Sequence, residues 1–254
     1  DELYTVLGRL RQGKTERYRI FNNHLLNTDD KFVHADGDKG LVMIVFTLPS
    51  YDLVFKIIRD KFGYPKTVKR EDVLEKYRLV SKHDRAGRLI DTQEFRKLEF
   101  PLARFASELL EELLSEAADT VVIEGEKLII NHVYIERRVR PLNLYLREAH
   151  HAAAERAILD YGQTIRDLAN TDIFPGDLLL KNFGVTRHQR VVFYDYDEVA
   201  LVTECNFREI PEARDDDDMM RSDIWYHVNQ HDIFPEEFIK FLAMDGKLRK
   251  LFME

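Results

Sequence analysis

The sequence predicts an α+β fold with two lobes, in which a mainly β lobe containing a helix precedes a mainly α lobe. Two observations support this fold class. Apolar, β-branched segments bounded by turns lie before residue 139, whereas apolar residues at helical spacing dominate after it. With 254 residues the chain is long enough to bury a substantial core. We expect a helical lead-in at 1–30, the first lobe at 31–138 and the second at 139–254.

Short apolar segments separated by turns predict the strands of the first lobe. Residues 41–48 and 53–58 are apolar and rich in β-branched side chains, so we expect two buried strands with a turn at Pro49. In 102–118 apolar residues recur at helical spacing, which predicts a helix. The other elements expected before residue 139 are helices in the first thirty residues and at 68–84, and strands at 121–123 and 127–135.

The remainder of the chain has a mostly helical pattern. A run of aspartates at 215–218 predicts a solvated loop. The elements expected here are helices at 142–150 and 152–170, a short strand at 191–194 and a last helix starting at Pro235.

The composition excludes several classes of protein. A net charge of -8 argues against a nucleic-acid partner, which rewards a basic surface. The single Cys205 excludes an internal disulfide framework and a zinc site with several thiolates, and it fits a reducing compartment. No apolar run reaches the ~18 residues that a membrane-spanning helix needs. We therefore expect a cytoplasmic protein with no nucleic-acid or membrane partner.

Three residues of the second lobe have a spacing typical of phosphoryl transfer. Asp177 is followed by Asn182 five residues later, and Asp195 comes just after the predicted strand. In kinases the first aspartate takes the proton of the attacking hydroxyl, while the asparagine and the second aspartate bind Mg²⁺. The alternative is that Asp177 and Asn182 only cap a helix or form a turn.

Further charged residues flank this motif. Asp197 and Glu198 place more carboxylates beside Asp195, and such a cluster repels itself unless a cation such as Mg²⁺ or Mn²⁺ is present. The alternative is a solvated loop. Lys181 has the charge to stabilise a transferring phosphoryl group, or it pairs with a neighbouring acid.

Lys56 lies within the second predicted strand, where an ammonium group needs an anionic partner if it is buried. The phosphates of ATP are one such partner, and a glutamate from a following helix is another. Glu108, Glu111 and Glu112 are the candidates on the 102–118 helix, and we favour Glu111. The alternative is an edge-strand lysine that faces water.

A glycine-containing turn immediately precedes the first strong strand. Gly37 and Gly40 allow backbone N–H groups to face phosphate oxygens, although the pattern is not G-x-G-x-x-G. A plain β-turn is the alternative.

Several long motifs together carry a family resemblance. They include Tyr134-Ile-Glu-Arg-Arg138, Ile173-Phe-Pro-Gly-Asp177, Lys181-Asn-Phe-Gly-Val-Thr-Arg-His188, Val191-Val-Phe-Tyr-Asp-Tyr-Asp-Glu198 and Arg88-Leu-Ile-Asp-Thr-Gln-Glu-Phe95. Over essentially the whole chain they resemble the bacterial isocitrate dehydrogenase kinase/phosphatase family, in its kinase-like region. The family's N-terminal regulatory domain and final C-terminal stretch are expected to be missing from this chain.

The resemblance implies a protein-kinase-like two-lobed fold and a bifunctional enzyme. Such an enzyme uses ATP to phosphorylate a serine of NADP-dependent isocitrate dehydrogenase, and it removes the phosphate in a nucleotide-dependent reaction. This controls the branch between the tricarboxylic acid cycle and the glyoxylate bypass. The implied cofactors are ATP or ADP with Mg²⁺ or Mn²⁺, and isocitrate dehydrogenase is the implied partner; a homodimer is left open.

The resemblance also implies roles for individual residues. The catalytic residues would be Asp91, Asp177 and Asp197; the metal ligands Asn182 and Asp195; the nucleotide-binding residues Ala35, Asp36, Gly37, Asp38, Lys39, Gly40, Leu41 and Lys56. Beside these we expect Lys181 to be catalytic and the hinge at Glu136 and Val139 to contact the nucleotide. The family's phosphate loop usually has the sequence Ala-Pro-Gly-Ile-Arg-Gly. Asp36 and Asp38 depart from it, and two extra carboxylates weaken nucleotide binding unless Mg²⁺ offsets them.

Two other functions are compatible with the sequence. One is a small-molecule kinase of the kinase-like fold, which an acidic cleft selecting a cationic substrate would favour. The other is a catalytically silent kinase-like module that binds isocitrate dehydrogenase or nucleotide, which the altered phosphate loop would favour.

Overall fold

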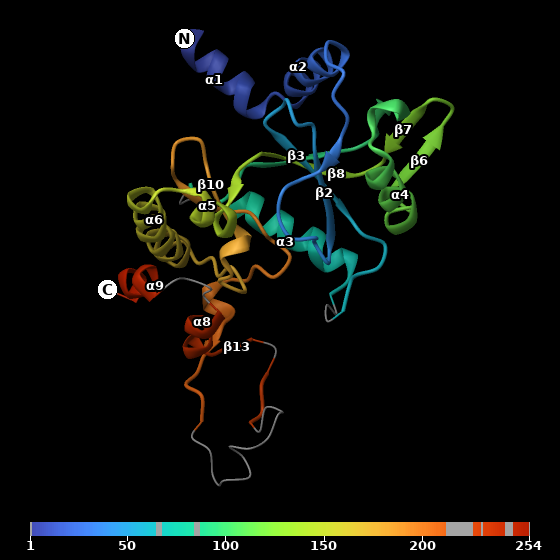
Figure 1. Ribbon diagram of the computed structural model, residues 1–254. Helices are drawn as coiled ribbons and strands as arrows, with labels where there is room; N and C mark the ends of the chain where they lie inside the picture. The colour runs from blue at the N-terminus through green and yellow to red at the C-terminus, as the bar shows by residue number, and fades with distance from the viewer. Residues whose placement is uncertain are drawn as a thin grey trace. The chain divides into compact units, whose positions relative to one another are not determined.

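A computed structural model of the chain describes residues 2–64, 68–83, 87–211, 226–229, 231–241 and 246–253 (Figure 1). The chain divides into two compact units. Unit 1 comprises residues 1–70 and 91–138, and unit 2 comprises residues 71–90 and 139–254. Helices and antiparallel sheets both contribute to the structure, which confirms the α+β class. No described helix is long and apolar enough to cross a membrane.

Unit 1 is built on a five-stranded antiparallel sheet. Its strand order is β1 (Val33–His34), β2 (Met43–Thr47), β3 (Leu53–Ile58), β8 (Val133–Arg137) and β4 (Thr92–Phe95). The predicted strands at 41–48 and 53–58 are thus confirmed, with the first one shorter at both ends. Helices α1 (Glu2–Gln12) and α2 (Lys14–Leu26) precede the sheet and are separated at Gly13.

The register of this sheet brings three polar side chains to one face. Lys56 pairs with Tyr134, and Val54 pairs with Glu136, so Lys56 and Glu136 are diagonal neighbours on adjacent strands. Diagonal neighbours of an antiparallel pair lie on the same face of the sheet. Thr92 is directly opposite Glu136 on the other side of β8. The hydrogen-bonded ladder therefore gathers Lys56, Glu136 and Thr92.

A smaller sheet and a helix complete unit 1. The sheet has the order β5 (Leu98–Pro101), β7 (Lys127–Ile130) and β6 (Val121–Glu124), and α4 (Ser107–Glu116) lies beside it (Figure 1). The predicted helix at 102–118 is shorter, because Leu102–Arg104 forms a 3-10 turn instead. The prediction of one strand at 127–135 is wrong: the chain leaves β7 after Ile130 and enters β8 in the other sheet.

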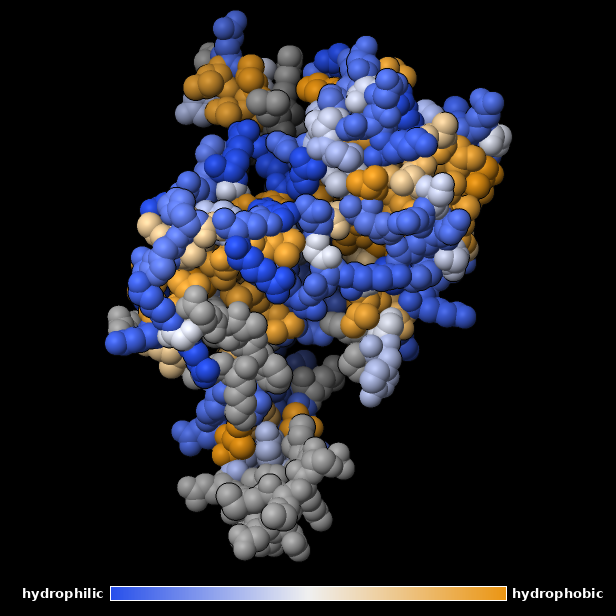
Figure 2. All heavy atoms as spheres, in the orientation of Figure 1, coloured by the Kyte–Doolittle hydropathy of each residue, from blue (hydrophilic) through white to orange (hydrophobic). Residues whose placement is uncertain are grey.

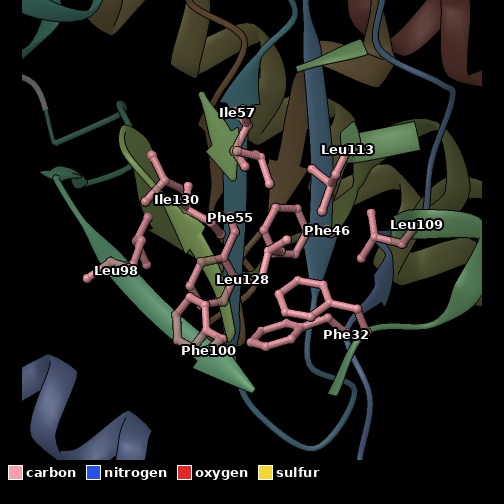
Figure 3. Close-up of a cluster of buried hydrophobic side chains, with 14 of the residues drawn as sticks. Phe32, Phe46, Phe55, Ile57, Leu98, Phe100, Leu109, Leu113, Leu128 and Ile130 are labelled. Carbon is pink, nitrogen blue, oxygen red and sulfur yellow. The ribbon is translucent and has the colours of Figure 1, made fainter. Parts of the chain in front are cut away.

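The core of unit 1 is dominated by aromatic rings. Phe55 is fully buried, and its ring centroid lies 5.2 Å from that of Phe46 and 5.4 Å from that of Phe32 (Figure 3). The ring centroid of Phe21 lies 5.3 Å from that of Phe55. Leucines and isoleucines from α4 and from both sheets surround these rings. Burial of aromatic and aliphatic side chains from both sheets in one cluster stabilises the strand register.

Helices and short strands make up unit 2. The helices are α3 (Arg70–His83), α5 (Leu142–Glu148), α6 (His151–Asn170), α8 (Pro235–Phe241) and α9 (Gly246–Met253). The first residue of α3, Arg70, is assigned to unit 1 and the rest of the helix to unit 2. The strands are β9 (Arg140–Pro141), β10 (Phe183–Val185), β11 (Val191–Phe193), β12 (Asn206–Phe207) and β13 (Asp232–Ile233). The helices predicted at 142–150 and 152–170 are confirmed. The aspartates at 215–218 lie outside the described residues.

Most of the face in Figure 2 is hydrophilic, with smaller hydrophobic patches between the polar side chains. In unit 1 the exposed apolar side chains include Val122 and Ile123 of β6, which are 42% and 41% exposed. Scattered exposure of this kind is ordinary for a folded protein.

We predict that Phe55→Ala lowers the free energy of unfolding of unit 1 by about 3–5 kcal/mol, because it leaves a cavity among several rings. Val122→Ala, at an exposed site, is the control and changes it by less than about 0.5 kcal/mol. Urea denaturation measures both variants. Equal effects of the two substitutions would contradict the description of this core.

Candidate functional site

The segment that carries Asp177 is held against the segment that follows Asp195, within unit 2. The backbone N–H of Phe174 donates to the carbonyl of Ala200 at 2.8 Å, and that of Ala200 donates back at 2.9 Å. Gly176 directly precedes Asp177 and has a φ of 90°, and a Cβ atom at this position would lie 2.6 Å from the Cβ of Glu198. Only glycine tolerates both that backbone conformation and that close approach.

Asp177 and Asn182 are in direct contact. The side-chain amide of Asn182 donates to Asp177 Oδ1, and the backbone N–H of Leu179 donates to the same oxygen at 3.2 Å. The second of these bonds is a turn made by the aspartate side chain, as the structural alternative predicted. It orients the Asp177 carboxylate.

A strand end brings Asp195 to the same region of unit 2. The backbone N–H of Tyr194 donates to the carbonyl of Asn182 at 3.1 Å, and the Tyr194 hydroxyl donates to the carbonyl of Lys181. Asp195 follows directly and is half-buried, whereas Asp197 is only 8% exposed. The structure therefore gathers Asp177, Asn182 and the Asp195 segment, as their spacing predicted.

Sequence reasoning missed one residue that organises this region. Arg88 is 4% exposed; its Nε lies 2.7 Å from Asp167 Oδ2, and its Nη1 lies 3.0 Å from Asp160 Oδ2, both on α6. The Arg88 carbonyl accepts from Phe193 N–H at 2.8 Å, next to the start of the Asp195 segment. A buried arginine that satisfies two carboxylates holds the end of β11 against α6. Arg88 belongs to a quoted motif, but its contacts were not foreseeable from spacing.

Lys56 forms a buried ion pair in unit 1. Its Nζ lies 2.7 Å from Glu136 Oε2, and their side chains are 6% and 1% exposed. Thr92 Oγ1 donates to the other oxygen, Glu136 Oε1, at 2.7 Å. The prediction of Glu111 as partner of Lys56 is wrong, because β8 is the neighbouring strand and Glu136 is the diagonal neighbour of Lys56. The other alternative, an edge-strand lysine that faces water, is excluded because the Lys56 side chain is buried.

The environment of Glu136 contains both influences that raise the pKa of its carboxyl group and groups that lower it. Burial raises the pKa of the Glu136 carboxyl, while the Lys56 ammonium and the Thr92 hydroxyl lower it and the nearby Asp91 carboxylate raises it further. The net shift is upward. The Glu136 side chain is committed to Lys56 and Thr92, so any nucleotide contact at this position falls to the backbone. Val139, at the start of the next part of unit 2, lies against Gly184.

The loop Ala35–Leu41 is anchored at both ends. The N–H of Ala35 donates to the carbonyl of Val45 at 3.0 Å, and a Cβ atom at Gly40 would lie 2.5 Å from the Met43 carbonyl oxygen. Gly40 is therefore required for the chain to enter β2. Lys39, inside the loop, pairs with Glu112 at 2.9 Å.

Asp91 differs from the buried acids. It directly precedes β4, its side chain is 64% exposed, and the closest ion pair is with Arg17 of α2 at 3.4 Å. Lys181 is exposed as well. Among the described residues no group of three or more histidine, cysteine or acidic side chains is assembled for a metal ion.

Unit 1 thus contains the buried Lys56–Glu136 ion pair and a glycine-containing loop, and unit 2 contains the Asp177–Asn182 contact beside the Asp195 segment. Residues of these types are the ones that protein kinases use for phosphoryl transfer.

Comparison with known proteins identifies the family. Residues 30–254 match the family described as isocitrate dehydrogenase kinase/phosphatase (AceK) kinase domain. An isocitrate dehydrogenase kinase/phosphatase of Xanthomonas axonopodis pv. citri is 56% identical over 245 residues, which cover 96% of this chain and 42% of that protein. One of Anaeromyxobacter sp. is 52% identical over 254 residues, 100% of this chain and 44% of that protein. The chain belongs to the isocitrate dehydrogenase kinase/phosphatase family, and it spans less than half the length of these relatives.

We predict that Glu136→Ala destabilises unit 1 by about 3–5 kcal/mol, because it leaves the Lys56 ammonium buried without this carboxylate. The double variant Lys56→Met/Glu136→Leu removes both charges and recovers most of that loss. Urea denaturation of the two variants and the parent measures the difference. A double variant that is less stable than Glu136→Ala would contradict the view that the unpaired charge causes the loss.

Proposed function

We propose that this chain performs the reactions named in its relatives: phosphorylation of isocitrate dehydrogenase by ATP, and removal of that phosphate. The observation that carries the proposal is the contact between Asp177 and Asn182 beside the segment of Asp195. Family membership supplies the substrate. We further propose a protein-kinase-like fold for the two units. A single free Cys205 fits a reducing cytoplasm.

Asp177 is the proposed general base of the kinase reaction. Two hydrogen bonds to Oδ1 hold its carboxylate in one orientation. A carboxylate held in this way accepts the proton of a serine hydroxyl as that oxygen attacks phosphorus. Lys181, exposed in the same segment, is the proposed cation for the negative charge that develops on the phosphoryl group.

Asn182 and Asp195 fit a Mg²⁺ or Mn²⁺ ion. The Asn182 amide uses its nitrogen to donate to Asp177, which leaves its oxygen turned away from that carboxylate. An amide oxygen and a carboxylate are hard ligands of the type Mg²⁺ prefers, and Mg²⁺ commonly completes its shell with water and nucleotide phosphates. When bound, the metal ion neutralises charge on the phosphates.

ATP or ADP is the proposed cofactor. In unit 1 we propose Lys56 as the residue for the nucleotide phosphates, with Glu136 keeping its ammonium group in place. The loop Ala35–Leu41 is proposed to supply backbone N–H groups to the phosphates, and the backbone of Glu136–Val139 to contact the base.

For the phosphatase reaction we propose that Asp91 and Asp197 act on the attacking water. The two acids are in different settings: Asp91 is mostly exposed, and Asp197 is buried. An exposed carboxylate is accessible to a phosphoprotein substrate, and a buried one is better placed to orient a water molecule.

We predict that Asp177→Asn lowers the rate of phosphorylation of isocitrate dehydrogenase by about 10²- to 10⁴-fold, as loss of a general base does. The assay incubates the chain with isocitrate dehydrogenase, Mg²⁺ and labelled ATP. The control is Asp119→Asn, a similar charge change at an exposed position of unit 1.

Phosphorylated isocitrate dehydrogenase is then incubated with the chain, Mg²⁺ and ADP to measure phosphate release. Undiminished labelling by Asp177→Asn would contradict the assignment of the base. If the unsubstituted chain neither labels isocitrate dehydrogenase nor releases phosphate from it, the proposed function is contradicted. The chain would then be a binding module.

A further inference from the structure

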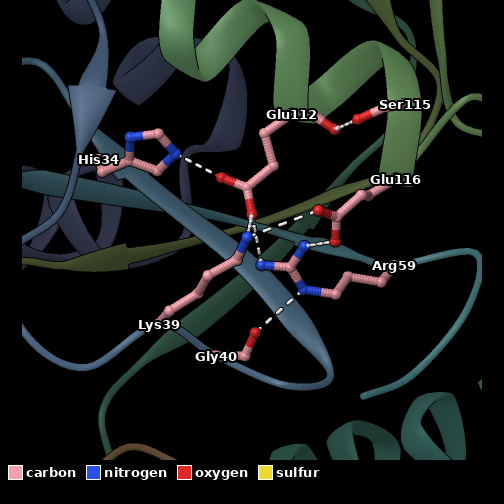
Figure 4. Close-up of polar contacts among 7 residues, drawn as sticks. All are labelled: His34, Lys39, Gly40, Arg59, Glu112, Ser115 and Glu116. Atoms are coloured by element: carbon pink, nitrogen blue, oxygen red, sulfur yellow. Dashed lines mark hydrogen bonds and ion pairs between the residues drawn. The ribbon is translucent and has the colours of Figure 1, made fainter.

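A cluster of charged side chains joins the loop Ala35–Leu41 to helix α4 in unit 1 (Figure 4). Arg59, which directly follows β3, lies at its centre and is 3% exposed. Its Nη2 donates to Glu112 at 2.7 Å, its Nη1 pairs with Glu116, and its Nε donates to the carbonyl of Gly40 at 3.0 Å. Arg59 therefore connects α4 with the end of the loop.

Two further side chains connect the rest of the loop to the same helix. Lys39 Nζ lies 2.9 Å from Glu112 Oε1 and 3.5 Å from Glu116 Oε1. His34, just before the loop, pairs through Nε2 with Glu112 Oε2. Glu112 and Glu116 are four residues apart, so both carboxylates project from one face of α4. The helix thus contacts the loop before it, within it and at its end.

Two members at the centre of this cluster, Arg59 and Glu112, are largely buried, which makes their geometry specific. The Glu112 side chain is only 10% exposed. Burial alone would raise the pKa of this carboxyl, but hydrogen bonds from Lys39, Arg59 and His34 lower it to about 2. The carboxylate is charged at neutral pH, and a buried charge that loses its partners is costly. The cluster therefore restrains the loop more than exposed ion pairs would.

We propose that Glu112 and Arg59 are positioning residues that hold the loop Ala35–Leu41 in one conformation before nucleotide binds, and that Lys39 belongs to this contact with α4. The inference rests on the proposed function, since it takes this loop to be the one that binds the nucleotide phosphates. A loop that is already ordered loses less conformational entropy when a ligand binds. Loosening it weakens nucleotide binding without removing any group that touches the phosphates.

The test compares Glu112→Gln with Glu111→Gln. Both substitutions remove one negative charge from α4, but Glu111 is exposed, and among the described residues no hydrogen bond or ion pair joins its side chain to the loop. Glu112→Gln leaves Arg59 its contacts with Glu116 and Gly40, so the unit is expected to fold, which circular dichroism checks. Two quantities are measured: amide hydrogen exchange of residues 35–41 without nucleotide, and the dissociation constant of Mg²⁺–ADP by calorimetry.

We expect Glu112→Gln to speed exchange in the loop and to raise the dissociation constant by about 3- to 10-fold, while Glu111→Gln changes neither. Unchanged exchange in Glu112→Gln would overturn the contact with α4 as a restraint. Faster exchange with an unchanged dissociation constant would overturn its role in nucleotide binding. A chain that binds no Mg²⁺–ADP even without substitution would contradict the proposed function itself.

Lys39→Met, at a side chain that is 66% exposed, keeps the test decisive if Glu112→Gln does not fold. We expect Lys39→Met both to speed amide hydrogen exchange in residues 35–41 and to weaken the binding of Mg²⁺–ADP. Weaker binding with unchanged exchange would assign Lys39 to the nucleotide instead of α4 and overturn this part of the inference.

Discussion

The buried pair between Lys56 and Glu136 is the interaction on which the organisation of unit 1 depends. Two charged groups that are almost fully excluded from water require close contact and further hydrogen bonds to offset their desolvation. The 2.7 Å separation and the hydroxyl of Thr92 supply both. Since the three residues lie on three neighbouring strands, the pair tolerates only one register of β3, β8 and β4.

The same principle organises the other motifs. Around the glycine loop, Arg59 and Glu112 are buried ions whose partners include the loop itself. In unit 2, buried Arg88 satisfies Asp160 and Asp167 and thereby holds the strand that precedes Asp195. Lys56, the glycine loop and the Asp195 segment thus each adjoin a buried charged network in their own unit, and Gly176 adds a steric requirement beside Asp177.

The sequence predicted the elements better than the partners. The strands at 43–47 and 53–58 and the helix α6 follow from apolar patterns that extend over several residues. Contact between Asp177 and Asn182 was predictable, because five residues and one turn separate them. The separation of β7 from β8 was not, since both segments are apolar and only their pairing assigns them to different sheets.

Contacts between residues that are distant in sequence can be predicted only when the strand pairing and register are known. The kinase pattern favours a helical glutamate such as Glu111 as the partner of Lys56, but the diagonal neighbour of Lys56 on β8 is Glu136. Arg88 gave no signal of its own, since one arginine in a motif does not reveal two carboxylates more than seventy residues away. Topology, and not local propensity, decides these contacts.

The central claim is that Lys56, held by Glu136, faces the nucleotide phosphates. The most direct test treats the chain with an ATP analogue that carries an amine-reactive acyl phosphate and maps the acylated lysines by mass spectrometry. We expect acylation of Lys56 that Mg²⁺–ATP suppresses, whereas acylation of the exposed Lys61 is unaffected by Mg²⁺–ATP. A Lys56 that is not acylated, or that is acylated equally with Mg²⁺–ATP present, would contradict the account.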